Sequence, residues 1–169
     1  MNLLKKLLRR TRYKLRGFHD KARQYALKLL SYRGRSEKEL QERLRKKGIT
    51  QAEAFSTINY LKDIGLIDDM SLAENLKREA LTTKLLSQNG ARRYMLNRGI
   101  PHNIVDLLFS RDENKDIETA RSLVDKKFKT LRSYTPETIK RRLYNFLMRR
   151  GYSFETIKTV LKDKTFKEE

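Results

Sequence analysis

Hydrophobic residues recur along this chain at intervals of three and four, which is the spacing of one face of an α-helix. The spacing predicts helices in three pairs: residues 22–32 and 52–64, residues 72–86 and 103–109, and residues 118–131 and 154–163. A more basic helix is predicted between the two helices of each pair. Proline occurs only at Pro101 and Pro136, and both directly follow turn signals where a helix can begin. The pattern therefore predicts an all-α protein.

Residues that favour helix starts precede several of these stretches. Three pairs fit the Ser/Thr-x-x-Glu capping box, namely Ser36 with Glu39, Thr50 with Glu53, and Ser71 with Glu74. Thr135, directly before Pro136, is a further candidate for an N-cap.

Glycines follow the apolar stretches at positions where a left-handed residue can end a helix, at Gly34, Gly48, Gly65, Gly99 and Gly151. Gly48, Gly99 and Gly151 are separated by 51 and 52 residues. Apolar residues recur four positions before each (Leu44, Met95, Leu147), eight before (Leu40, Ala91, Leu143) and one after (Ile49, Ile100, Tyr152). This period predicts a repeated structural unit.

Combined with the helix pattern, the period predicts three tandem three-helix repeats behind a basic N-terminal helical arm. The expected boundaries are 1–23 for the arm and 24–68, 69–116 and 117–169 for the repeats. Because each repeat contacts its neighbours, we expect an elongated, curved array.

Charge changes the picture from fold to partner. The 169 residues include 40 Lys and Arg against 21 Asp and Glu, a formal charge of +19, and the pI is about 10.2. Residues 1–23 carry nine basic residues and one acidic, and residues 117–169 carry 14 and seven, so the charge is concentrated at the two ends. Such a chain favours nucleic acid or an acidic protein surface as its partner, and small anionic substrates do not require this charge.

The absence of cysteine fits a reducing compartment, and we expect a cytoplasmic location. No apolar run is long enough to span a membrane. The leucines and cations of residues 1–18 would also suit a helix lying on anionic lipid, although a basic arm or a docked helix explains them as well.

Catalytic and metal-binding patterns are sparse. His19 and His102 are far apart, and neither has ligand-like spacing around it, which favours solvent-facing side chains. Asp68 and Asp69 resemble a carboxylate pair for a metal, but they directly precede a helix, where acidic residues cap free amides. We therefore expect no enzyme activity, no metal and no cofactor.

Basic residues cluster before the three periodic glycines. The candidates for contact with a partner or DNA are Arg43, Arg45, Lys46 and Lys47, then Arg92, Arg93 and Arg98, then Lys140, Arg141, Arg142, Arg149 and Arg150, together with Arg33 and Arg35 in the first turn. Complementing the helix dipole explains one or two cations per helix, not three to five.

Two other interpretations of these clusters were weighed. A helix-turn-helix would insert the N-terminal end of the middle helix into the major groove, but in the first repeat that end carries Glu37, Glu39 and Glu42. Tyr32, Tyr144 and Tyr152 could stack on the bases of a single strand, although tyrosines at helical spacing more often belong to a core.

The stretches ALKLLSYRGRSEKELQERLRKKGI, YLKDIGLIDD and GARRYMLNRGI together resemble the RecX family, regulatory proteins of the bacterial recombinase RecA. The resemblance is close over about residues 24–111 and looser in the last repeat. Matching positions are Arg33, Arg35, Ser36, Glu39, Leu40, Leu44, Gly48, Leu61, Gly65, Leu66, Asp68, Asp69, Gly90, Gly99 and Ile100. Leu72 stands where the family usually has Phe, which should alter packing and not function.

The resemblance implies a monomeric, non-enzymatic protein that binds the RecA filament on single-stranded DNA, in its groove or at its end. It implies restraint of ATP hydrolysis, strand exchange and repressor co-cleavage. The alternative is a nonspecific DNA-binding helical protein that competes for DNA, because charge alone does not separate the two.

Overall fold

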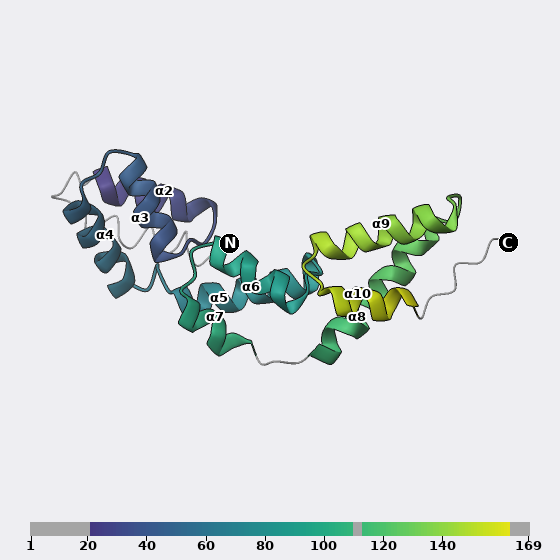
Figure 1. Cartoon of the computed structure of the whole chain (residues 1–169). Helices are drawn as coiled ribbons and strands as arrows, with labels where there is room; N and C mark the ends of the chain where they lie inside the picture. Colours follow the sequence, from purple (N-terminus) through teal and green to yellow (C-terminus); the bar gives the residue numbers. More distant parts are fainter. Residues whose placement is uncertain (1–20, 110–112, 163–169) are drawn as a thin grey trace. The chain divides into compact units, whose positions relative to one another are not determined.

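The computed structural model describes residues 21–109 and 113–162 (Figure 1). Within these ranges the chain is helical and contains no strand, which confirms the predicted all-α class. The helices are α2 (Lys21–Tyr32), α3 (Glu37–Lys46), α4 (Gln51–Asp63), α5 (Asp69–Arg78), the π-helical segment η1 (Glu79–Thr83), α6 (Gln88–Asn97), α7 (His102–Leu108), α8 (Glu113–Lys129), α9 (Pro136–Arg149) and α10 (Phe154–Lys162). Residues 1–20 of the predicted N-terminal arm, including His19, lie outside the described residues.

The chain divides into two compact units, residues 1–72 and 73–169. The division into three repeats is finer than this one and stays a prediction, as does the curved shape of the array.

In the first unit, α2, α3 and α4 pack against one another. Their shared core consists of Ala22, Ala26, Leu30, Leu40, Leu44, Ala54, Ile58 and Leu61, with Ile67 from the following turn. These residues occupy the predicted apolar face of each helix, so the periodicity found the core of this unit.

In the second unit, α8, α9 and α10 contact one another, and α6 contacts both η1 and α7. The core around α8 to α10 consists of Ala120, Leu123, Val124, Leu131, Ile139, Leu143, Leu147, Tyr152, Ile157, Val160 and Leu161. Tyr152, weighed above as a stacking platform, is a core residue with only 3% of its surface exposed.

The periodic glycines end their helices in the left-handed conformation, as predicted. The φ angles of Gly48, Gly99 and Gly151 are 82°, 78° and 85°. At Gly48, its N–H donates to the carbonyl of Arg45 and the N–H of Ile49 donates to the carbonyl of Leu44, which is the Schellman arrangement. The same two bonds recur at Gly99 and at Gly151. A local motif of about six residues therefore ends α3, α6 and α9 in the same way.

Gly34 corrects the prediction, because it is not among the residues with positive φ. A Cβ at Gly34 would lie 3.0 Å from Cδ1 of Leu72. The glycine makes room for the Leu72 side chain and does not adopt the left-handed conformation.

The predicted helix starts are confirmed at Thr50 and corrected at Ser71. Thr50 and Glu53 form the complete capping box, and the hydroxyl of Ser36 accepts from the backbone N–H of Glu39. Helix α5 already begins at Asp69, so Ser71 lies inside it. Asp68, directly before the helix, caps it instead, because its carboxylate accepts from the N–H groups of Met70 and Ser71.

The helix predicted over residues 72–86 does not continue to its end. It passes into η1, and Leu85 then adopts a φ of 51°. Leu85 packs against the core of α8 to α10, and its carbonyl accepts from the hydroxyl of Tyr152 at 3.4 Å. These contacts with a segment 67 residues away interrupt a helix that the local sequence favours.

Candidate partner-binding surface

The first two candidate cations, Arg33 and Arg35, both pair with Glu39. Nη1 of Arg33 lies 2.9 Å from Oε2 of Glu39, and Arg35 also pairs with the Glu39 carboxylate. Nε of Arg35 donates to the carbonyl of Leu29 at 3.2 Å. Only 9% of the Arg35 side chain and 14% of the Glu39 side chain are exposed. Arg35 therefore holds the turn between α2 and α3 and is not available to a partner.

The cations at the end of α3 are exposed and stay candidates for a contact surface. Arg43, Arg45, Lys46 and Lys47 are all exposed. Nζ of Lys47 lies 5.7 Å from the centroid of the Tyr25 ring, which favours one position of this side chain.

In the second unit the predicted cations before Gly99 have three different environments. Arg92 bonds to Asp106, with 2.6 Å between Nη1 and Oδ1, and to the carbonyl of Phe109 at 3.2 Å, so it ties α6 to α7. Arg98 is half-buried, and its Nη1 lies 3.5 Å from the hydroxyl of Tyr94. Arg93 is exposed.

Around α9, aromatic rings position two of the five predicted cations. The guanidinium of Arg142 lies 3.8 Å from the centroid of the Tyr134 ring, and that of Arg150 lies 3.9 Å from the centroid of Phe146. Both distances fit cation–π contacts. Lys140, Arg141, Arg142 and Arg149 are exposed, and Arg150 is half-buried.

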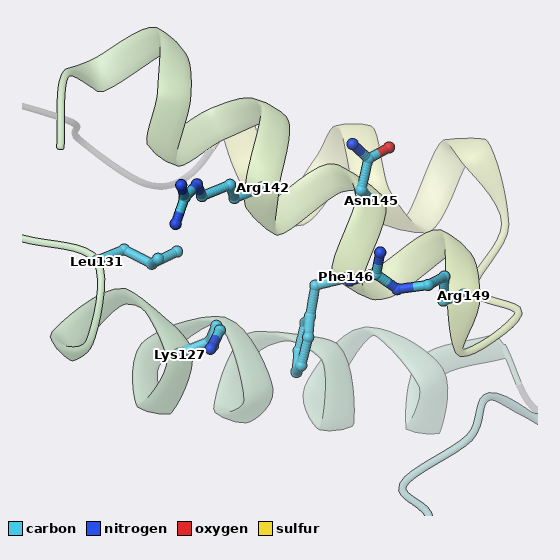
Figure 2. A pocket seen from close by; sticks show the side chains of 6 residues that line it. All are labelled: Lys127, Leu131, Arg142, Asn145, Phe146 and Arg149. Atoms are coloured by element: carbon cyan, nitrogen blue, oxygen red, sulfur yellow. The ribbon is translucent and has the colours of Figure 1, made fainter.

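A hollow of about 310 Å³ lies between α8 and α9. Its lining includes the predicted Arg142 and Arg149 and four residues that the sequence analysis did not select: Lys127, Leu131, Asn145 and Phe146. Figure 2 shows the Phe146 side chain pointing from α9 toward α8, with Lys127 and Leu131 to one side of it and Arg149 to the other.

The signal for the hollow was present in the sequence. Arg142, Asn145, Phe146 and Arg149 are spaced i, i+3, i+4 and i+7, so they share one face of α9. This face lies beside the apolar one formed by Ile139, Leu143 and Leu147, so apolar periodicity alone does not mark it.

Both adjacent aspartates accept from backbone N–H groups, but only Asp68 caps the helix that follows it, as predicted. Asp69 accepts from the backbone N–H of Glu37 at 3.0 Å, at the start of α3. Burial raises the pKa of Asp69 above its usual value, and the bond from Glu37 offsets part of this rise. The hydroxyl of Ser71 lowers the pKa of Asp68. His102 is exposed, as expected.

The remaining two tyrosines differ. Tyr144 is half-buried and packs against the core of α8 to α10, whereas 73% of Tyr32 is exposed.

In the described ranges, no helix is both long and apolar enough to cross a lipid bilayer.

Compact helical units with exposed cations define the class, an all-helical protein built from three-helix domains. Sequence comparison matches residues 22–61 to the first three-helix domain of RecX and residues 114–161 to its third three-helix domain. The regulatory protein RecX of Streptomyces coelicolor is 30% identical over 135 residues, which cover 79% of this chain and 72% of that protein. The chain belongs to the RecX family of regulatory proteins.

Two further relatives extend the match. The regulatory protein RecX of Chlorobaculum tepidum is 29% identical over 146 residues, or 86% of this chain and 89% of that protein. The crystal structure of RecX from Lactobacillus salivarius superposes with a TM-score of 0.66 at 26% identity, and the match covers 85% of this chain and 94% of the other.

Proposed function

We propose that this protein regulates RecA by binding the RecA filament on single-stranded DNA, in its groove or at its end. In this proposal it acts in the cytoplasm as a monomeric inhibitor of ATP hydrolysis, strand exchange and repressor co-cleavage, without catalysis or a cofactor. Support comes from the family membership and from the resemblance to RecX described above.

One structural observation carries the proposal further. The same glycine motif ends α3, α6 and α9, and exposed cations precede it on each helix: Arg43, Arg45 and Lys46; Arg93; Lys140, Arg141, Arg142 and Arg149. A structural motif that recurs along the chain, each time with exposed cations on the helix before it, suits a partner that is itself a repeating filament. The three-repeat division at 24–68, 69–116 and 117–169 is part of this proposal.

The competing function is nonspecific DNA binding, and the hollow between α8 and α9 is the observation that favours it. The two functions differ in their response to salt. Binding to DNA phosphates weakens steeply as salt rises, because each contact releases a counterion. A contact with RecA that buries specific protein surface does not require this dependence.

The test is a titration of RecA with the full-length protein, measuring ATP hydrolysis on single-stranded DNA at increasing salt. Binding of the protein to the same DNA without RecA is measured in parallel by fluorescence anisotropy. We expect inhibition to persist at salt concentrations where binding to bare DNA is no longer detected. Inhibition that disappears together with bare-DNA binding would support the competing function.

A pair of triple variants tests the surface on α3. Arg43→Gln, Arg45→Gln and Lys46→Gln together should weaken inhibition, since they remove three of the four exposed cations before Gly48. The control combines Lys21→Gln, Lys28→Gln and Lys38→Gln, which removes the same charge from exposed positions elsewhere in the first unit. If the two triple variants weaken inhibition equally, the exposed cations of α3 act only through the net charge of the protein and not as a specific contact surface.

A further inference from the structure

The hollow between α8 and α9 combines charge with an apolar floor. Lys127, Arg142 and Arg149 contribute three cations, and no acidic residue is among its six lining residues. Leu131 is buried, and Phe146 is half-buried against the core of α8 to α10. A ligand that fits must therefore carry negative charge together with a flat or apolar part.

The spacing of the cations favours an extended anion. Arg142 and Arg149 are seven residues apart on α9, which places their Cα atoms about 10 Å apart along the helix axis at 1.5 Å per residue. Lys127 faces them from α8 (Figure 2). Cations on both walls of an open hollow suit a chain of phosphates better than one isolated ion.

The neutral side chains favour a nucleotide over an acidic peptide. Phe146 offers an aromatic ring on which any base can stack, and the amide of Asn145 can both donate to and accept from a base edge. An acidic peptide would use the cations but would need neither the ring nor the amide. The volume of about 310 Å³ lies at the lower end of the ~300 to 1,000 Å³ typical of small-ligand sites.

We propose that this hollow binds single-stranded nucleic acid directly, with its phosphates on Arg142, Arg149 and Lys127 and a base against Phe146. Arg142 is held over Tyr134, which reduces the side-chain freedom that binding would otherwise have to remove. Arg150, which does not line the hollow, lies over one face of the Phe146 ring, so the base would use the rest of the ring. The site goes beyond RecA regulation, because it requires no RecA, and it names the residues that the competing DNA-binding function would use.

The experiment measures binding of the full-length protein to a fluorescent oligothymidylate of about 10 nucleotides, within the ~4 to 16 nucleotides that a single-strand-binding fold covers. No RecA is present. Arg142→Gln and Arg149→Gln should each lower the slope of log affinity against log salt by about 0.7. The matched control is Arg141→Gln, which removes the same charge from the neighbouring exposed position of α9 and does not line the hollow.

The aromatic contact is tested with Phe146→Leu, which should weaken oligothymidylate binding by about 10-fold. Phe146→Tyr keeps the ring and should restore it, which separates stacking from a loss of core packing. An abasic oligomer with the same phosphates should bind the wild type and Phe146→Leu equally, since it has no base to stack. Oligouridylate in place of oligothymidylate shows whether the site prefers DNA or RNA.

Three results would each overturn the proposal. The first is an equal effect of Arg141→Gln and Arg142→Gln, which would indicate net charge alone. The second is unchanged oligothymidylate binding by folded Phe146→Leu. The third is competition by polyglutamate as effective as that by unlabelled oligothymidylate, which would assign the hollow to acidic protein. All of them leave the RecA titration unaffected, so failure here is distinguishable from failure of the regulatory proposal.

Discussion

Gly90 and Gly151 lie so close together that a Cβ at position 151 would be 2.7 Å from the Cα of Gly90. The contact brings the start of α6 against the end of α9. The backbone N–H of Ser87 donates to the carbonyl of Arg150 at 3.0 Å, and its hydroxyl donates to the carbonyl of Gly151 at 2.5 Å. The N-cap of one helix thus satisfies carbonyls at the C-terminal end of another.

Replacing Gly151 by Ala should destabilise the protein more than replacing Gly48 by Ala. Both glycines have φ near +80°, which costs about 1 kcal/mol for Ala. No atom lies within 4 Å of a Cβ at Gly48, whereas one at Gly151 would meet Gly90 and Arg93. We expect about 1 kcal/mol for Gly48→Ala and about 1 to 3 kcal/mol more for Gly151→Ala, from the crowding.

Urea denaturation followed by circular dichroism measures both free energies of unfolding. Gly90→Ala should also be costly, because its Cβ would lie 2.2 Å from the carbonyl oxygen of Arg150. Asn89→Ala, at the exposed neighbouring position, is the control. Equal losses for Gly48→Ala and Gly151→Ala would contradict the close packing of α6 and α9.

Removing the charge of Glu39 should destabilise the first unit, because this carboxylate pairs with both Arg33 and Arg35. We expect Glu39→Gln to lower the free energy of unfolding by about 2 kcal/mol, less than the ~3 to 5 kcal/mol of a fully buried pair, since Arg33 is partly exposed. Glu42→Gln, exposed on the same helix, should change it by less than about 0.5 kcal/mol. If Glu39→Gln and Glu42→Gln both change the free energy of unfolding by similarly small amounts, the pairing does not hold Arg35, and Arg35 is again a candidate for contact with a partner.

Asp116 should stabilise the start of α6, since its Oδ1 accepts from the backbone N–H of Gln88 at 3.0 Å. Asp116→Ala leaves this donor without the carboxylate and should cost about 1 to 2 kcal/mol. Asp116→Asn keeps an acceptor oxygen and should cost less. The control is Glu118→Ala, at an exposed position two residues further along α8. Thermal unfolding measures the stability of all three variants. No difference between the Ala and Asn variants would argue against the bond.

Tyr152 should make the protein sensitive to alkaline pH. Burial raises the pKa of its hydroxyl from 10.0 to about 12, with Asp116 adding to the rise and Arg150 opposing it. Because the folded state disfavours the phenolate, this contribution to stability is complete below pH 10.0 and is lost as pH rises through about 12.

The comparison is between wild type and Tyr152→Phe in urea at neutral pH and at about pH 11, where the free tyrosine is mostly ionised. At neutral pH the variant should lose less than about 1 kcal/mol, because the bond from the hydroxyl to the Leu85 carbonyl is long at 3.4 Å. At alkaline pH wild type should lose more stability than the variant. Parallel losses would show that Tyr152 ionises without opposition from the fold.

The sequence by itself determined the helices, the apolar face of each and the glycines that end α3, α6 and α9. These features depend on local backbone geometry and on spacing within about ten residues, and the sequence contains both directly. Gly34 was misassigned because a glycine needed for close approach to Leu72 looks the same in sequence as one that ends a helix.

Tertiary structure alone decided which cations are exposed and which are structural. Arg92 and Arg93 are the same residue type at adjacent positions, yet Asp106 and the Phe109 carbonyl bind Arg92 while Arg93 is exposed. Only packing joins the lining residues of α8 and α9 into one hollow. The reason is physical, because charge and helical face are local properties, whereas burial and partners depend on residues that folding brings together from distant positions.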